Sequence, residues 1–147
     1  LEIYLNDRNV SSLIRTKEVG ALASIVSVYT EVRAKLSEIQ REYAKSESLV
    51  MDGRDIGTVI IPNAELKVFV DADVDERARR RWAELQAKGE TANVEEIAAD
   101  LRERDHRDRN RPIAPLKRAD DAKLLDTTTL SIEQGITEIL SWVETLQ

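Results

Sequence analysis

The stretch LKVFVDAD, residues 66–73, decides the fold class of this sequence. Its first five residues form a short apolar run of strand length, which then ends in polar side chains. Two other runs have the same form: SLVM (48–51) leads into Asp-Gly-Arg-Asp, and AKLL (122–125) leads into Asp-Thr-Thr. These three runs predict three strands whose carboxyl ends carry acidic and hydroxyl groups.

Helical patterns lie between and around these runs, and a short alternating run opens the chain. We expect a strand over residues 1–5, with a turn at Asn6-Asp7. The expected helices are one from Thr16, then 30–44, 75–88, 94–108 and 132–146. Strands that alternate with helices indicate an α/β fold with a parallel sheet. Ligands of such sheets bind beyond the carboxyl ends of the strands, which here are residues 52–55, 71–73 and 126–128.

The composition excludes several classes of protein. The 147 residues suffice for a domain with a core, and the net charge of −6 argues against a general nucleic-acid binder. With no cysteine and a single histidine, His106, we expect no disulfide, no thiol nucleophile and no resident metal site. No apolar run reaches membrane-spanning length and no secretory signal opens the chain, so we expect a cytoplasmic protein without a membrane partner.

The most charged stretch is LRERDHRDRNR, residues 101–111, in a helix that Asn93 is expected to cap. Along this helix Leu101, Arg104, Asp108 and Arg111 recur at spacings of three, four and three, so they share one face. A solvated face is the plain interpretation of such a run. Because the stripe begins apolar, we instead expect Arg104, Asp108 and Arg111 to form a site that grips an anion.

The other charged residues of this stretch have the spacing of ordinary surface ion pairs. Glu103 lies four residues before Arg107, and Asp105 four residues before Arg109. We expect both pairs on a solvated face. We also expect His106 at the surface, and Trp82 and Trp142 in the core. The last helix, with a capping box at Ser131–Gln134, is expected to bury the apolar residues Ile136, Ile139, Leu140 and Val143.

Two further motifs could carry chemistry. MDGRDIGT (51–58) places Arg54 and Asp55 at a strand end, although a turn with a local ion pair would explain it equally well. Its two glycines would permit a tight backbone. The segment DERARRR (75–81) carries three arginines at helical spacing. They form either a solvated basic face or a cationic lid over a polyphosphate, and they are Arg77, Arg80 and Arg81.

Taken together, these segments resemble bacterial cytidylate kinases, which phosphorylate CMP and dCMP with ATP. The resemblance covers almost the whole chain in the family's order, and DGRDxGTV followed by RDxRDRNR is highly specific. The segments are SSLIRTKEV (11–19), MDGRDIGTVIIPNAELKVFVDA (51–72), ERARRRWAELQAKG (76–89), RERDHRDRNRPIAPL (102–116) and DDAKLLDTTTLSIEQ (120–134).

The resemblance implies roles for individual residues. Recognition of the cytosine ring would fall to Ser24, Arg33 and Asp55, and physical reasoning alone does not single out Ser24 or Arg33. Arg54 would hold the acceptor phosphate, while Arg104 and Asp108 would contact the sugar. In the lid, Arg77, Arg80, Arg81 and Arg111 would contact the phosphates. The residues that the resemblance implies to be catalytic are Arg54, Arg81 and Arg111. ATP and Mg²⁺ would be required, and no protein-held metal is implied.

The resemblance also implies a fold and a segment order. The fold would be a P-loop nucleoside monophosphate kinase-like parallel sheet flanked by helices. The family's first, central strand carries Gly-x-x-x-x-Gly-Lys-Ser/Thr, which these 147 residues do not contain. We therefore expect the C-terminal two-thirds of such an enzyme, monomeric when complete. The expected segments are part of the CMP-binding insert (1–28), core α/β (29–77), the lid region (78–116) and core α/β with the C-terminal helix (117–147).

Two alternatives stay open. The chain could be a non-catalytic pyrimidine-nucleotide-binding fragment that keeps CMP contacts without ATP chemistry. It could also be a nucleoside monophosphate kinase that prefers UMP. A nucleic-acid-binding protein is disfavoured by the acidic charge and by the lack of aromatic stacking platforms.

Overall fold

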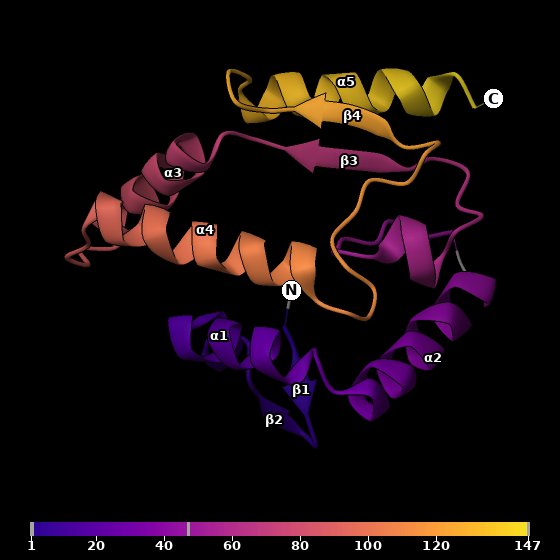
Figure 1. Cartoon of the computed structure of the whole chain (residues 1–147), viewed down its shortest axis with the longest axis horizontal. Helices are drawn as coiled ribbons and strands as arrows, with labels where there is room; N and C mark the ends of the chain where they lie inside the picture. Colours follow the sequence, from indigo (N-terminus) through magenta and orange to yellow (C-terminus); the bar gives the residue numbers. More distant parts are fainter. Residues whose placement is uncertain (1, 47, 147) are drawn as a thin grey trace. The chain divides into compact units, whose positions relative to one another are not determined.

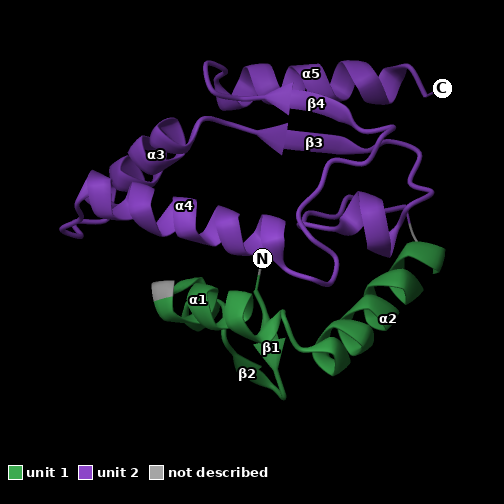
Figure 2. Cartoon of the chain, in the orientation of Figure 1, with its two compact units in different colours: residues 1–47 green, residues 48–147 purple. Residues whose placement is uncertain are grey.

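The computed structural model describes residues 2–46 and 48–146, apart from the side chain of Lys17. The chain forms two compact units, one of residues 1–47 and one of residues 48–147 (Figure 2).

Unit 1 begins with a hairpin. Strand β1 (Tyr4–Leu5) pairs antiparallel with β2 (Arg8–Asn9) through the predicted turn at Asn6 and Asp7. Both turn residues have positive φ, 48° and 66°, as the two-residue turn that matches strand twist requires. Of the strand expected over residues 1–5, Tyr4 and Leu5 are confirmed, and they pair within this hairpin; residue 1 lies outside the described residues.

The helices of unit 1 follow the sequence pattern. A 3₁₀ turn, η1 (Leu13–Arg15), precedes α1 (Lys17–Val26), and α2 (Thr30–Ser46) follows. The hydroxyl of Thr16 accepts a hydrogen bond from the backbone N–H of Val19 and so caps α1. Both helices confirm the prediction made from the spacing of their apolar residues.

Unit 2 contains the parallel sheet. Strand β3 (Val68–Asp71) pairs in parallel with β4 (Lys123–Asp126), and the register places Asp71 opposite Asp126 at the carboxyl ends. Three helices flank these strands: α3 (Val74–Ala87), α4 (Val94–Asn110) and α5 (Ile132–Glu144) (Figure 1). The structure thus confirms a mixed α/β fold with a small parallel sheet flanked by helices.

Side chains define the ends of these helices. Asn93 accepts a hydrogen bond from the N–H of Glu96, and Ser131 and Gln134 form the predicted capping box. Helix α3 ends at Ala87, and Gly89, just beyond its C-cap Lys88, has a φ of 76° that favours glycine. There the N–H of Glu90 bonds to the carbonyl of Leu85, which completes a Schellman motif.

The strand predicted over residues 48–51 is wrong for this chain. These residues form no strand, and Val50 is fully exposed. A strand requires ladder hydrogen bonds from a neighbour, and β4 is the only strand that pairs with β3 among the described residues. Downstream of it lies a π-helical turn, η2 (Ile56–Ile60), which no sequence pattern predicted.

The core of unit 2 consists mostly of small side chains. Ala78 of α3 is fully buried and Ala98 of α4 is 6% exposed, so the two helices approach closely. The expected burial of the α5 stripe is wrong. Ile136 is 52% exposed and Leu140 is 55% exposed, because no described element covers that face of the helix. Trp82 is likewise exposed.

Among the described residues, none of the helices combines the length and the apolar character that crossing a bilayer demands.

Candidate functional site

The two motifs that the sequence presents separately lie against each other in unit 2. Arg54 Nε donates a hydrogen bond of 3.1 Å to Asp108 Oδ2, and Arg111 Nη2 lies 3.5 Å from Asp55 Oδ1. Two neighbouring residues of the 51–58 motif thus pair crosswise with two residues at the end of α4. We call this arrangement the crossed ion pairs.

The crossed ion pairs are largely withdrawn from water. Asp55 and Asp108 are buried, and the side chain of Arg111 is only 8% exposed. Arg111 Nε also donates to the carbonyl oxygen of Ala114. The helical stripe therefore predicted correctly that Asp108 and Arg111 face the protein. Arg104 differs, because its side chain is 46% exposed and its Nε lies 3.9 Å from Asp108 Oδ2.

The π-helical turn fixes Arg54 and Asp55. The backbone N–H groups of Val59 and Ile60 both donate to the carbonyl oxygen of Asp55, and Ile60 is buried. A Cβ atom on Gly53 would lie 2.8 Å from Ile56 Cγ1, so a side chain there would displace Ile56. The glycine is needed for this close approach and not for positive φ, which Gly53 does not have.

Arg77 of α3 joins three elements. Its Nε donates to the carbonyl oxygen of Ala72 just beyond β3, and its two terminal nitrogens donate to the carboxylate of Asp105 on α4 at 3.2 and 2.6 Å. The predicted surface pair of Asp105 with Arg109 is therefore wrong. The packing of α3 against α4 brings Asp105 to Arg77 instead. The other predicted pair, Glu103 with Arg107, is confirmed at 3.8 Å on the surface.

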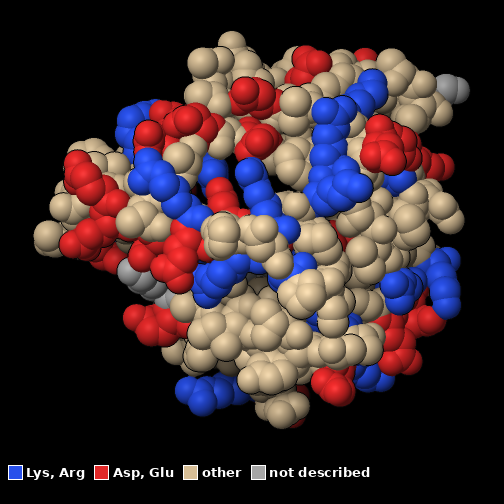
Figure 3. Space-filling view, in the orientation of Figure 1, with Lys and Arg blue, Asp and Glu red and all other residues tan. Residues whose placement is uncertain are grey.

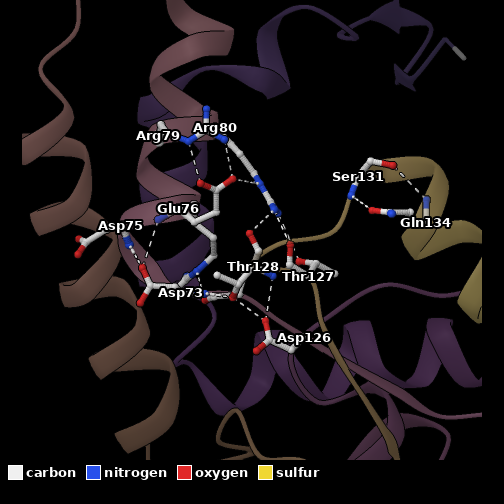
Figure 4. A network of polar contacts seen from close by, with 12 residues as sticks. Asp73, Asp75, Glu76, Arg79, Arg80, Asp126, Thr127, Thr128, Ser131 and Gln134 are labelled. Atoms are coloured by element: carbon white, nitrogen blue, oxygen red, sulfur yellow. Dashed lines mark hydrogen bonds and ion pairs between the residues drawn. The ribbon is translucent and has the colours of Figure 1, made fainter.

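Arg80 belongs to a network at the carboxyl ends of the strands (Figure 4). Its Nε donates to Glu76, and its terminal nitrogens donate to the hydroxyl and the carbonyl oxygen of Thr127. Thr128 accepts a hydrogen bond from the N–H of Asp73 and so ties the two strand ends together. Hydrogen bonds from Arg79 and Arg80 lower the pKa of Glu76 from 4.5 to about 2.

The third arginine of this group is less constrained. Arg81 pairs only with Glu84, one turn further along α3, among the contacts that the structure records for it, and both side chains are substantially exposed. An exposed pair of this kind holds a side chain weakly. Arg77, Arg80 and Arg81 therefore differ in the number of contacts that hold them, although they are neighbours in sequence.

A cleft of about 420 Å³ opens between these elements of unit 2. Its walls come from the 51–58 motif, from β3 and from α3 and α4, and they include Arg54, Arg77, Arg80 and Asp105. The size suits a small-molecule ligand. Charges of both signs are interleaved over the face in view in Figure 3, so no broad single-sign field of the kind that attracts nucleic acid covers it.

The predicted cytosine-recognition residues are divided between the two units. Ser24 lies on α1 and Arg33 on α2 of unit 1, whereas Asp55 belongs to unit 2. Within unit 1 both residues lie next to Ser27, because its hydroxyl donates to the carbonyl oxygen of Ser24 and Arg33 Nη1 donates to the carbonyl oxygen of Ser27.

The described residues contain no cluster of three or more histidine, cysteine, aspartate or glutamate side chains that could hold a metal ion. A protein-only metal cage therefore does not fit this part of the chain. Mg²⁺ often binds through substrate phosphates with only one or two carboxylates of the protein. The described residues are compatible with that kind of binding.

Sequence reasoning missed one member of the site, Asp105. The signal was present, because Asp105 lies four residues after Leu101 and three before Asp108 and so also follows the buried stripe of α4. Asp105 was nevertheless assigned to the surface, because Arg109 lies four residues further along and has the spacing of a surface ion-pair partner. The contacts of Thr127 and Thr128 could not be found from spacing, since they join residues about fifty positions apart.

Comparison with known proteins agrees with the resemblance. A sequence model of a family described as cytidylate kinase matches residues 1–145. The cytidylate kinase of Mannheimia succiniciproducens is 50% identical over 97% of this chain, and cytidylate kinase 1 of Haemophilus influenzae is 51% identical over 98%. The chain spans 64% and 62% of the length of these two relatives. On these matches, the chain belongs to the cytidylate kinase family.

Proposed function

We propose that this chain carries the acceptor-nucleotide and phosphate-contacting part of an enzyme that transfers a phosphoryl group from ATP to CMP or dCMP. The products would be ADP and CDP or dCDP. The observation that carries the proposal is the crossed ion pairs, which bring Arg54 and Asp55 against Asp108 and Arg111 beside the cleft. Arginine suits a nucleoside monophosphate because its guanidinium donates hydrogen bonds to phosphate oxygens. Aspartate suits it because its carboxylate accepts hydrogen bonds from the sugar hydroxyls and from the donors of the base.

Each residue has a proposed role. Ser24, Arg33 and Asp55 would recognise the cytosine ring, which presents an amino donor beside ring and carbonyl acceptors. Arg54 would hold the acceptor phosphate, with Arg104 and Asp108 on the sugar. The remaining arginines would neutralise the negative charge of the phosphate groups during phosphoryl transfer; they are Arg77, Arg80, Arg81 and Arg111.

The crossed ion pairs suit such a site in the absence of nucleotide. Two arginines close together would repel one another, and each is neutralised by a carboxylate within 3.5 Å. A phosphate that enters would compete with Asp108 for Arg54, which is 40% exposed and so accessible to it. The guanidinium groups would then meet the ligand already oriented, which reduces the cost of binding.

The proposed chemistry is in-line transfer, in which positioning and neutralisation of charge supply most of the catalysis. ATP would bring Mg²⁺ on its phosphates, and no step is routed through an ion held by the protein. Closure of the helices α3 and α4 over the phosphates would exclude water as a competing acceptor. The proposal includes a monomeric, cytoplasmic enzyme with neither nucleic acid nor membrane as a partner.

We further propose that these 147 residues do not turn over CMP by themselves, since they lack Gly-x-x-x-x-Gly-Lys-Ser/Thr. The same absence favours a second candidate, a non-catalytic pyrimidine-nucleotide-binding fragment. A UMP-preferring kinase is the remaining alternative, and the proposed base-recognising trio argues against it.

A kinase assay with ATP, Mg²⁺ and a panel of CMP, dCMP, UMP and AMP separates these candidates. It should be run on this chain and on a chimera that adds the unmatched part of the M. succiniciproducens enzyme. We expect CDP formation by the chimera alone, strongly reduced by Arg54→Lys and unaffected by Arg107→Lys, a control on the exposed side of α4. Robust activity of the chain alone, or a preference for UMP, would contradict the proposal.

A further inference from the structure

Helix α4 carries two carboxylates one turn apart, and each holds an arginine from another element. Asp105 holds Arg77 of α3, and Asp108 holds Arg54 of the 51–58 motif. Both arginines line the same cleft. The spacing of the two acids on one rigid helix therefore sets how far apart these two cations can lie.

The contact between Asp105 and Arg77 is the more constrained of the two. It is bidentate, with both terminal nitrogens of the guanidinium engaged, while Nε is bound to the carbonyl oxygen of Ala72. The side chains of Arg77 and Asp105 are only 30% and 24% exposed. Hydrogen bonding to Asp105 raises the pKa of Arg77 further, so the guanidinium stays charged.

We propose that Asp105 is a positioning residue for phosphate binding, which holds the guanidinium of Arg77 at the wall of the cleft that Arg54 also lines. This inference rests on the proposed function, because it takes the cleft to be the phosphate-binding site. Asp105 itself contacts no phosphate. Two N–H groups of the Arg77 guanidinium are not needed for the hydrogen bonds to Asp105 and Ala72, which leaves donors for a phosphate oxygen.

The sign of the effect distinguishes positioning from simple electrostatics. Asp105 is an acid that lines the cleft, so it repels a phosphate that enters. If its charge were its whole contribution, Asp105→Asn would tighten the binding of a polyanion. If Asp105 positions Arg77, the same substitution weakens the binding of the polyanion. The guanidinium would then adopt orientations in which it cannot donate hydrogen bonds to the phosphate oxygens.

The test is calorimetric titration of the full 147-residue chain with inorganic pyrophosphate. We expect Asp105→Asn to weaken binding about three- to tenfold, the range typical of losing one oriented charged contact. Glu103→Gln is the matched control, since it removes the same charge from a solvent-exposed pair on the same helix. We expect it to change affinity less than about twofold. Asp105→Glu, which keeps the carboxylate, should retain part of the affinity.

A second substitution guards against loss of folding. Arg77→Lys keeps the positive charge but cannot make the bidentate contact, and we expect it to weaken pyrophosphate binding to a similar extent. In the Arg77→Lys background, Asp105→Asn should cause no further loss. Helical circular dichroism of each variant establishes that it is folded.

Two outcomes would overturn the inference and can be told apart. Equal or tighter binding by folded Asp105→Asn, with binding by the unaltered chain intact, would refute the positioning role alone. Failure of the unaltered chain to bind pyrophosphate would refute both this role and the proposed phosphate site.

Discussion

The pair of Arg111 with Asp55 offers a sharp test of how the site is built. Both side chains are nearly buried, at 8% and 11% exposure, and their charged atoms are 3.5 Å apart. With an effective dielectric constant of about 20, two unit charges at that distance attract by roughly 5 kcal/mol. Desolvation offsets much of this attraction, but removal of one partner leaves the other charge buried, which typically costs about 3–5 kcal/mol.

We therefore expect Arg111→Ala to lower the free energy of unfolding by about 3–5 kcal/mol, a large share of the roughly 5–15 kcal/mol of a typical domain. The substitution also removes the hydrogen bond from Arg111 Nε to Ala114. Urea denaturation followed by circular dichroism measures the change. Arg81→Ala, which breaks an exposed pair on α3, is the control and should cost no more than about 0.5 kcal/mol.

The double variant Asp55→Asn with Arg111→Met completes this test. Since it removes both charges and keeps most of the volume, it should recover much of the stability that Arg111→Ala loses. A loss below about 1 kcal/mol for Arg111→Ala would refute the reasoning, because the pair would then contribute no more than a surface contact.

Three further predictions concern α3 and α5. The pKa of Glu76 is about 2 instead of 4.5, so its stabilising contribution is complete above pH 4.5 and is lost as the pH falls through 2. Carboxyl-carbon NMR should find its midpoint near 2, and a midpoint near 4.5 would contradict the hydrogen bonds from Arg79 and Arg80. Ser131→Ala should cost about 1 kcal/mol in urea denaturation because it removes the capping box of α5, whereas Ser141→Ala, within that helix, should be nearly neutral. Gly89→Ala should cost about 1 kcal/mol in the same experiment, since φ at this position is 76°, and an unchanged midpoint would argue against the Schellman end of α3.

Local chemistry made much of the fold predictable from sequence. The Asn6-Asp7 turn and the caps at Asn93 and Ser131 follow from rules that act over a few residues. The parallel sheet of β3 and β4 was predicted from the alternation of strands with helices along the chain. The helical spacing on α4 also predicted that Asp108 and Arg111 face inward, and the structure adds the partners that spacing could not name.

The failures share one physical cause, which is dependence on a neighbour. The run at 48–51 has the composition of a strand, but composition does not supply a ladder partner. The stripe of α5 has the pattern of a buried helix face, yet Ile136 and Leu140 remain exposed. Asp105 was paired with Arg109 by spacing, but the packing of α3 against α4 gave it Arg77 as its partner. The roles proposed for all the site residues, Ser24 and Arg33 among them, stay predictions.

The π-helical turn over Ile56–Ile60 makes the length of this segment matter as much as its chemistry. A π-turn holds one more residue per hydrogen-bonded loop than an α-helix, so removal of any single residue from 56–59 would convert it to α-helical pairing. Ile60 would still be free to anchor the segment in the core, but Arg54 and Asp55 would be turned by about 100° around the local axis and away from Asp108 and Arg111. Natural sequences that keep this site should therefore tolerate exchange of side chains within the segment far more readily than insertion or deletion.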